Sequence, residues 1–284
     1  MREYLGMFKL RIVALLVFVA MVAAAVGSGG SLQVERLLLL FAAGALASMG
    51  ASVLNHYFDR DIDALVPRTS NRPLPSGRIK PSTACWLGVL LVGTSLLLSS
   101  RLNYLTTMYI LAGALVYVLV YTVWLKRRSA LNIVIGGLAG SCAVLAGYAA
   151  IRGDTTLLAL LLALLIFLWT PPHFWAFAIA KSSDYTRAGV PMLPVKYGND
   201  RAAKLIVMHT VLLVQASLLL YAFGYFGGLY LVVAVVLGVL LLAFNLKLLA
   251  TRSTGWAWRS YRFSGIYLIV LFTAILLDAL FKQA

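Results

Sequence analysis

Oxygen-bearing side chains recur at a four-residue spacing near the end of an apolar run. Asn55, Asp59 and Asp63 occupy positions i, i+4 and i+8, so on a helix they share one face. Amide and carboxylate oxygens are ligands for Mg²⁺, which usually shares them with substrate phosphates. Two carboxylates this close repel each other unless a cation lies between them. The spacing therefore predicts a metal site, whereas Asp61 on the opposite face suits a solvated ion pair.

An arginine-rich loop follows directly, between residues 68 and 78. Prolines stiffen this loop, and it presents the guanidinium groups of Arg68, Arg72 and Arg78. Arginine is suited to bidentate contacts with phosphate oxygens. Beside the acidic face, the loop predicts a diphosphate site. The alternative is a solvated helix end, in which the acids pair with Arg60 and Arg68.

A second group of polar residues surrounds the paired prolines of residues 169–175. Paired prolines predict an interrupted helix with free backbone carbonyls inside the membrane. If the helix resumes after them, His173, Lys181 and Asp184 lie near one face and point at one cavity. A histidine in a membrane helix is either a packed, hydrogen-bonded residue or a functional one. Both interpretations of His173 remain open at this point.

The elements that must position these residues are membrane helices. Of the 284 residues, 62% are apolar and only 12% are charged, a balance that soluble domains rarely show. Continuous apolar runs exclude a strand barrel, whose segments alternate. A helix needs about 20 residues to cross roughly 30 Å of hydrocarbon. We expect an all-α protein with nine such helices, at 12–29, 36–55, 84–100, 104–125, 133–151, 156–178, 204–223, 228–250 and 261–280.

The net charge of +15 suggests either nucleic-acid binding or a membrane topology signal. With the N-terminus in the cytoplasm, 20 of the 24 Lys and Arg residues fall on the cytoplasmic side of the nine helices. The other four are Arg36, Arg101, Arg152 and Lys282. This asymmetry follows the positive-inside rule. It supports a cytoplasmic N-terminus and argues against nucleic acid as a partner.

The predicted loops 56–83 and 179–203, both on the cytoplasmic side, are the longest and contain five of the nine acidic residues. Other loops leave no room for a second soluble domain, so residues 1–284 are expected to form one membrane domain. Cys85 and Cys142 lie in apolar runs without metal-ligand spacing and are assigned to packing. The sequence has no leader rich in Arg and Ser, which favours the plasma membrane of a prokaryote over an organelle.

Together these motifs resemble the UbiA-type intramembrane prenyltransferases, and within them the protohaem IX farnesyltransferase branch. The first signature joins the acids of residues 55–63 to the arginine loop 68–78, and the second joins residues 172–175 to residues 188–195. Residues 121–137 are similar to the connection between the fourth and fifth helices. The resemblance covers most of the chain and implies a UbiA-like bundle of nine transmembrane helices.

The resemblance implies a Mg²⁺-dependent transfer of a farnesyl group from farnesyl diphosphate to a vinyl group of haem B, giving haem O and diphosphate. Haem B is then a substrate and not a permanent cofactor. The lipid bilayer, haem A synthase and terminal-oxidase assembly proteins are the further partners that it implies.

The resemblance also assigns roles to residues. It implies that the metal is bound by Asn55, Asp59, Asp63 and Asp184. It implies that the diphosphate is bound by Arg68, Arg72, Lys126 and Lys181. In the wider superfamily the second motif has two Asp four residues apart, so Lys181 is expected to contact the diphosphate instead. His173 is a candidate for binding haem or moving a proton, and it completes a catalytic set with Asp59, Asp63 and Asp184.

Other functions remain open from the sequence. A prenyltransferase with a quinone-precursor or glycerol-phosphate acceptor differs mainly in the region of His173. A secondary transporter also has Pro-broken helices and intramembrane charges, but its charges lie near the midplane and not at one membrane face. A purely structural membrane subunit has no need of the Asn55–Asp59–Asp63 face.

Overall fold

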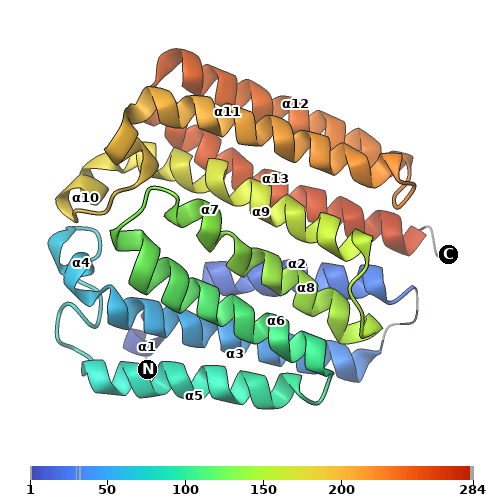
Figure 1. The fold of residues 1–284 in the computed structure, drawn as a ribbon, viewed down its shortest axis with the longest axis horizontal. Coiled ribbons are helices and arrows are strands. Elements are labelled where there is room, and N and C mark those ends of the chain that lie inside the picture. Colours follow the sequence, from blue (N-terminus) through green and yellow to red (C-terminus); the bar gives the residue numbers. More distant parts are fainter. Residues whose placement is uncertain (1, 30, 32, 282–284) are drawn as a thin grey trace.

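The computed structural model describes residues 2–29, 31 and 33–281, and within these ranges it contains helices and connections but no β-strand. The long helices run side by side as a bundle (Figure 1). Nine helical segments of the described chain are long and apolar enough to cross a membrane. The prediction of an all-α membrane protein with nine spans is therefore confirmed. Lys282, one of the four basic residues on the sparsely charged side, lies outside the described residues.

Six of the nine segments are single helices: α2 (Leu10–Gly27), α3 (Val34–Phe58), α5 (Pro81–Ser99), α9 (Leu157–Ala180), α12 (Gly228–Thr251) and α13 (Thr254–Phe281). A seventh, α11 (Leu193–Ala222), is kinked at Gly198, whose φ is 83°. The other two are composite, one made of α6 (Tyr104–Leu115), a π-helix η1 (Val116–Trp124) and a 3₁₀ turn η2 (Leu125–Arg127), the other of α7 (Asn132–Gly136) and α8 (Leu138–Arg152). Three short helices complete the fold: α1 (Arg2–Met7), α4 (Arg60–Leu65) and α10 (Ser182–Arg187).

The predicted helix ends agree with the structure to within three residues, except at two N-termini. α11 begins at Leu193 and not at residue 204, and α13 begins at Thr254 and not at residue 261. Both helices extend beyond their apolar runs into polar turns, which hydropathy does not detect. The two predicted loops are also partly helical, because α3 continues to Phe58 and α4 and α10 form within them.

The predicted interruption at the paired prolines is wrong, because α9 runs through Pro171 and Pro172 to Ala180. Proline has no N–H group, so two donors of the helix are still missing there. The Thr170 hydroxyl donates to the carbonyl oxygen of Ile166 at 2.7 Å. Neighbouring helices surround this stretch, since Thr170, Pro171 and Pro172 are all buried.

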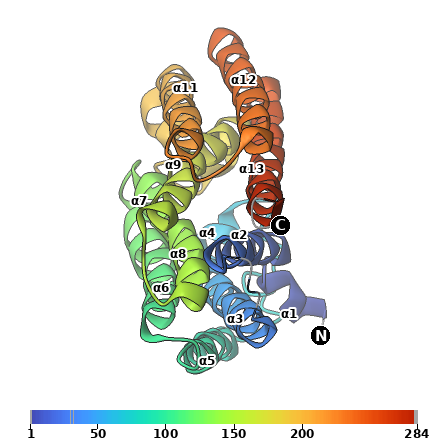
Figure 2. The same ribbon diagram turned by 90° about the vertical axis from the view of Figure 1, so that its right-hand side faces the viewer.

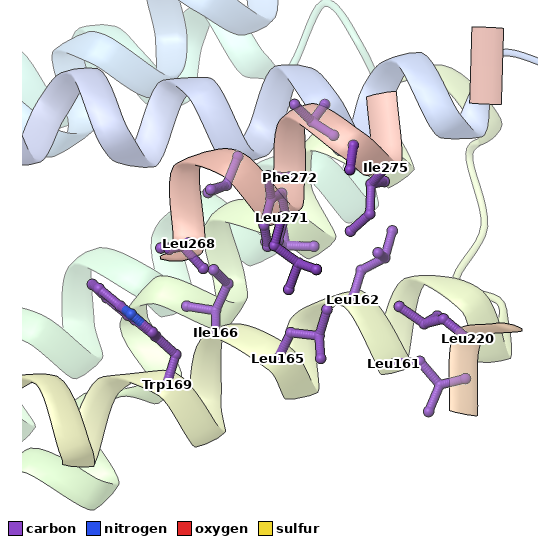
Figure 3. Packing of buried hydrophobic residues seen from close by; sticks show 14 of the residues in the cluster. Leu161, Leu162, Leu165, Ile166, Trp169, Leu220, Leu268, Leu271, Phe272 and Ile275 are labelled. Carbon is purple, nitrogen blue, oxygen red and sulfur yellow. The ribbon is translucent and has the colours of Figure 1, made fainter. Parts of the chain in front are cut away.

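α9 lies at the centre of the largest apolar cluster. Leu162, Leu165 and Ile166 point from α9 toward Leu271 and Ile275 of α13 (Figure 3). Seen from the end of the bundle, α9, α11, α12 and α13 form one group and α2, α3, α5, α6 and α8 form the other (Figure 2). Lipid tails are as apolar as leucine, so close packing more than water exclusion holds such helices together.

Glycine permits a close contact between α8 and α2. A Cβ atom added to Gly147 of α8 would lie 2.0 Å from the carbonyl oxygen of Ala20 in α2. The outer surface, by contrast, carries large apolar side chains, and Leu38, Trp86 and Leu97 are 65%, 74% and 73% exposed. Lipid is the solvent that suits such a surface.

Buried polar contacts fix the last three helices to one another. The Asn245 amide of α12 donates to the Thr210 hydroxyl of α11 at 2.7 Å. Asp278, near the end of α13, accepts from the backbone N–H of Gly227 at 2.7 Å and from that of Tyr230 at 3.3 Å. These N–H groups begin α12 and have no partner within their own helix. A carboxylate from one helix therefore caps the start of another.

Candidate active site

The three oxygen ligands predicted from the four-residue spacing lie together. Asn55 is in the last turn of α3, Asp59 is at the break before α4, and Asp63 is in α4. The N–H of Asp59 donates to the Asn55 carbonyl at 2.9 Å, and that of Asp63 to the Asp59 carbonyl at 2.8 Å. Helical spacing therefore continues across the break. The three side chains are buried, and all line one cavity.

Each of these acids is paired with a cation. Lys126 Nζ donates to Asp59 Oδ2 at 2.5 Å, and Arg72 Nη1 donates to Asp63 Oδ2 at 2.7 Å. The Asn55 amide also donates to Asp59 Oδ2, at 2.8 Å. The second carboxylate oxygen of Asp59 is buried without a hydrogen-bond partner. An acceptor without a partner, beside amide and carboxylate oxygens, has the donor chemistry that a hard cation prefers.

The pairing explains why a metal geometry is not preformed. Within the described residues, no group of three His, Cys, Asp or Glu side chains is arranged to hold a metal ion. Asp59, Asp63 and Asp184 all line the cavity, but a basic side chain contacts each of them. The metal set predicted from the sequence therefore lines one cavity, with its three acids in ion pairs.

The second predicted loop reaches the same cavity through Asp184. This residue lies in α10, at the same end of the bundle as α4 (Figure 1). Arg68 Nε donates to Asp184 Oδ2 at 3.2 Å, which joins the two acid-containing segments. Tyr185, beside Asp184, lines the cavity, and burial raises the pKa of its hydroxyl to about 12.

Lys181 does not reach the cavity lining, contrary to the expectation that it shares a face with His173 and Asp184. α9 ends at Ala180, and Lys181 has the non-helical backbone angles φ −125° and ψ 31°. Its ammonium group lies 5.6 Å from the centre of the Trp258 ring. Arg68, Arg72 and Lys126 do line the cavity.

Lys9 also lines the cavity, and the spacing of the sequence motifs does not predict it as a site residue. It precedes α2 with left-handed backbone angles, φ 49° and ψ 51°. Its ammonium group donates to Asn55 Oδ1 and, at 3.2 Å, to the Tyr117 hydroxyl. Burial, and next the charge of Arg72, lower the pKa of Lys9 to about 8. Its position directly before the first apolar run was the one available signal.

The π-helix η1 contributes aromatic side chains to the site. The rings of Tyr117 and Tyr121 stack with centroids 5.7 Å apart, and both residues line the cavity. The Thr122 hydroxyl accepts from the Asn55 amide at 2.9 Å and donates to the Tyr117 carbonyl at 2.8 Å. π-Helical turns are rare and frequently occur at functional sites.

Asp61 is outside this arrangement, as its position on the opposite face predicts. Its side chain is 62% exposed and receives two hydrogen bonds of 2.7 Å from the Arg127 guanidinium group. The hydrogen bonds from Arg127 lower the pKa of Asp61 to about 2. The solvated pair therefore forms with Arg127, whereas Arg60 contacts the Tyr57 carbonyl.

The cavity has a volume of about 860 Å³, in the range of roughly 300 to 1,000 Å³ that ligand pockets show. One end carries the three acids and their cations. The rest is apolar, with Leu15, Ile110 and Ile166 among its lining residues. Lining positions on α3 run from Leu40 to Asn55, roughly 22 Å along the helix axis. A long apolar chamber with a charged mouth suits an amphiphilic substrate.

His173 lies on the wall of this chamber, between aromatic rings. Its imidazole stacks on Trp169 with centroids 4.3 Å apart, and Tyr261 of α13 lies 4.5 Å away on a tilted plane. All three residues line the cavity. The other two histidines lie outside the lining, and His209 contacts the Leu205 carbonyl of its own helix.

Known proteins resemble the chain along nearly its whole length. Protoheme IX farnesyltransferase 1 of Cenarchaeum symbiosum is 45% identical over 286 residues, covering 99% of this chain and 96% of the relative. Protoheme IX farnesyltransferase of Symbiobacterium thermophilum is 43% identical, covering 98% and 94%.

Solved structures share the fold at lower identity. A structure of digeranylgeranylglyceryl phosphate synthase superposes with a TM-score of 0.83 at 23% identity, covering 98% of each chain. A UbiA homolog from Archaeoglobus fulgidus bound to GPP and Mg²⁺ gives a TM-score of 0.70 at 21% identity, covering 96% of this chain and 99% of the homolog. At these identities the similarity establishes the fold alone.

The family predicted from the motifs is confirmed by a match that covers most of the chain. Residues 16–272 match the UbiA prenyltransferase family. This range contains every acid of the site and most of the residues that line the cavity. The chain belongs to the UbiA prenyltransferase family.

Proposed function

We propose that the protein transfers a farnesyl group from farnesyl diphosphate to a vinyl group of haem B, forming haem O and releasing diphosphate. The observation that supports this most strongly is a single cavity with a charged mouth, an apolar chamber and His173 on its wall. The relatives at 45% and 43% identity are named protoheme IX farnesyltransferases. Family membership leaves no reason to retain the secondary-transporter and structural-subunit alternatives.

The charged mouth is the proposed diphosphate site. Arg68, Arg72 and Lys126 line it and would donate hydrogen bonds to phosphate oxygens. Lys9 joins this set in place of Lys181, whose ammonium group lies against Trp258. Donors already aimed into a water-poor cavity stabilise the negative charge that grows on the leaving group.

Asn55, Asp59, Asp63 and Asp184 would hold Mg²⁺, and their oxygen donors fit a hard cation. The Asp59 oxygen without a partner is the observation in favour. When bound, Mg²⁺ supplies Lewis-acid neutralisation of the diphosphate. In the structure, Arg72 and Lys126 pair with Asp63 and Asp59, and these cations offset the mutual repulsion of the two acids.

The chamber would hold the farnesyl chain and the acceptor. In the reaction the allylic C–O bond breaks, diphosphate leaves with the electron pair, and the vinyl group forms the new C–C bond. Water then adds to the remaining carbocation and loses a proton. The stacked rings of Tyr117 and Tyr121 lie where they favour a positive charge beside the mouth, and the apolar walls keep water from the first cation.

We place the protein in the plasma membrane of a prokaryote, with the charged mouth on the cytoplasmic side. The supporting observation is the distribution of basic residues among the loops, 20 of 24 on the side of the acids. Farnesyl diphosphate would then enter from the cytoplasm, with its charged diphosphate group at the mouth of the cavity.

The test is a direct product assay. Purified protein in nanodiscs is incubated with haem B, farnesyl diphosphate and Mg²⁺, with and without EDTA, and the haem is analysed by mass spectrometry. We expect a haem that is heavier by a farnesyl group and one water, formed only when the metal is available. Intact protein that binds haem but forms no such product would refute the haem acceptor, and quinone precursors and glycerol phosphates would be tested next.

A further inference from the structure

One ring nitrogen of His173 faces a serine of the neighbouring helix. Nδ1 lies 2.6 Å from the hydroxyl oxygen of Ser264 in α13. That hydroxyl is also 2.8 Å from the carbonyl oxygen of Tyr261 and is oriented to donate to it. Ser264 is 3% exposed, so water does not compete for either contact.

The hydrogen atoms available to these groups select one tautomer of His173. A serine hydroxyl has a single hydrogen to donate, and a carbonyl oxygen has none. Both contacts are satisfied only if Ser264 donates to Tyr261 and the imidazole donates from Nδ1 to Ser264. The opposite arrangement would leave two acceptor oxygens 2.8 Å apart with no hydrogen between them.

The second ring nitrogen then carries a lone pair that is open to the cavity. Nε2 of His173 has no hydrogen bond within the described residues, and it is not among the buried polar atoms that lack a partner. His173 itself lines the cavity. The atom is therefore accessible from the chamber, where a substrate would lie.

Packing fixes the direction of this lone pair. Trp169 stacks on the imidazole with centroids 4.3 Å apart and 25° between the planes, and the Tyr261 ring lies 4.5 Å from it at 37°. The Trp169 indole N–H donates to the Ser264 carbonyl at 2.8 Å, which ties this ring to the same turn of α13. Trp169 points from α9 toward that helix (Figure 3). Rotation of the imidazole is restricted, so Nε2 keeps one direction.

We infer that Ser264 is a positioning residue that holds His173 as its Nδ1–H tautomer, so that Nε2 ligates the iron of the haem acceptor. The inference rests on the proposed function. Neutral imidazole nitrogen is a common metal ligand. Metal-binding histidines usually donate their other N–H to a fixed partner, which sets the tautomer and raises ligand basicity. Ser264 is such a partner for the Nδ1–H of His173, and no sequence motif indicates this role.

The tautomer is measurable without haem. The chain has three histidines, so ¹⁵N-histidine labelling gives three pairs of ring signals, and His173→Gln assigns one of them. We expect His173 to be protonated at Nδ1 in the substrate-free protein and in Ser264→Thr. In Ser264→Ala we expect a mixture of tautomers. Protonation at Nε2 in the unaltered protein would overturn the inference.

Iron ligation is tested by adding ferrous haem B to the same proteins and recording the iron–histidine stretching band. We expect the band in the unaltered protein, its loss in His173→Gln, and haem binding about 10- to 100-fold weaker in Ser264→Ala. Ser264→Ala removes one oxygen atom, so packing changes little. His209→Gln, outside the cavity lining, is the control and retains the band.

The two proposals fail in different ways. Haem that binds through His173 without forming a prenylated product would refute the reaction and leave the ligation in place. Prenylated product from a protein whose haem spectrum is unchanged by His173→Gln would refute the ligation and leave the reaction in place.

Discussion

Asp59→Asn is the substitution whose effect the site geometry specifies best. The side chain is 2% exposed, and Lys126 Nζ lies 2.5 Å from one of its oxygens. The other oxygen is buried without a partner. Asparagine has nearly the same shape but no charge, so the exchange removes the electrostatic interaction and leaves the packing in place.

The magnitude follows from the same contacts. At 2.5 Å and an effective dielectric constant of about 20, the gross attraction between Lys126 and Asp59 is roughly 6 to 7 kcal/mol. Desolvation offsets part of it, and removal of one partner from a buried pair costs about 3 to 5 kcal/mol. The Lys126 side chain is 14% exposed, against 3% for Asp59, so it is partly solvated and we expect a loss of stability near the lower value. Turnover should fall further, by at least about 10³-fold, because the proposed metal site and the charge balance of the mouth are both lost.

Asp61→Asn is the matched control for this experiment. It lies two residues away, is 62% exposed and pairs with Arg127 at the surface, where such pairs contribute about 0 to 1 kcal/mol. Farnesyl transfer to haem and the unfolding midpoint are measured for both variants in nanodiscs. We expect Asp61→Asn to retain turnover. If Asp59→Asn turns over at the unaltered rate, the assignment of the charged mouth as the reaction site is wrong.

Three further outcomes are expected. Lys9→Met removes a charged donor from the mouth, so the KM for farnesyl diphosphate should rise about 10- to 100-fold; an unchanged KM would remove Lys9 from the site. Gly147→Ala places a Cβ atom 2.0 Å from the Ala20 carbonyl, which should cost about 1 to 3 kcal/mol in unfolding free energy, whereas Gly93→Ala has no atom within 4 Å and should not destabilise. Asp278→Ala removes the cap of α12 and should cost about 0.5 to 2 kcal/mol; equal midpoints for Asp278→Ala and the unaltered protein would show that the cap contributes nothing.

The parts of the fold that hydropathy determines were predictable. An apolar run must form a helix in lipid, since unsatisfied backbone groups are too costly there. Helix ends outside the apolar run were not predictable in this way, and α11 begins eleven residues before the predicted start because a mostly polar stretch, residues 196–204, separates its first turn from the apolar run. The spacing of Asn55, Asp59 and Asp63 gave a correct face because backbone hydrogen bonds continue across the break at Asp59.

The site residues that spacing missed reach the cavity through tertiary structure. Lys9 comes from a left-handed residue before α2, and Ser264 comes from a helix more than 90 residues from His173 along the chain. No local pattern links them to the acids. Lys181 fails for the converse reason, because a single non-helical residue turns its side chain away from the face that helical periodicity predicts.

The π-helix gives the chain an unusual sensitivity to length. At the end of η1, the Leu125 N–H is shared by the carbonyls of Tyr121 and Val120. The bond to Val120 spans five residues, one more than the hydrogen bond of an α-helix. Deletion of one residue within 116–124, with the π-helical turn kept, would move each later side chain by one position, about 100° around the helix axis. Lys126 would then lose its ion pair with Asp59, although no side chain of the site had been altered. Substitutions in this stretch should therefore disturb the site less than deletions. We expect natural variants of the protein to differ there in residue type while keeping the number of residues constant.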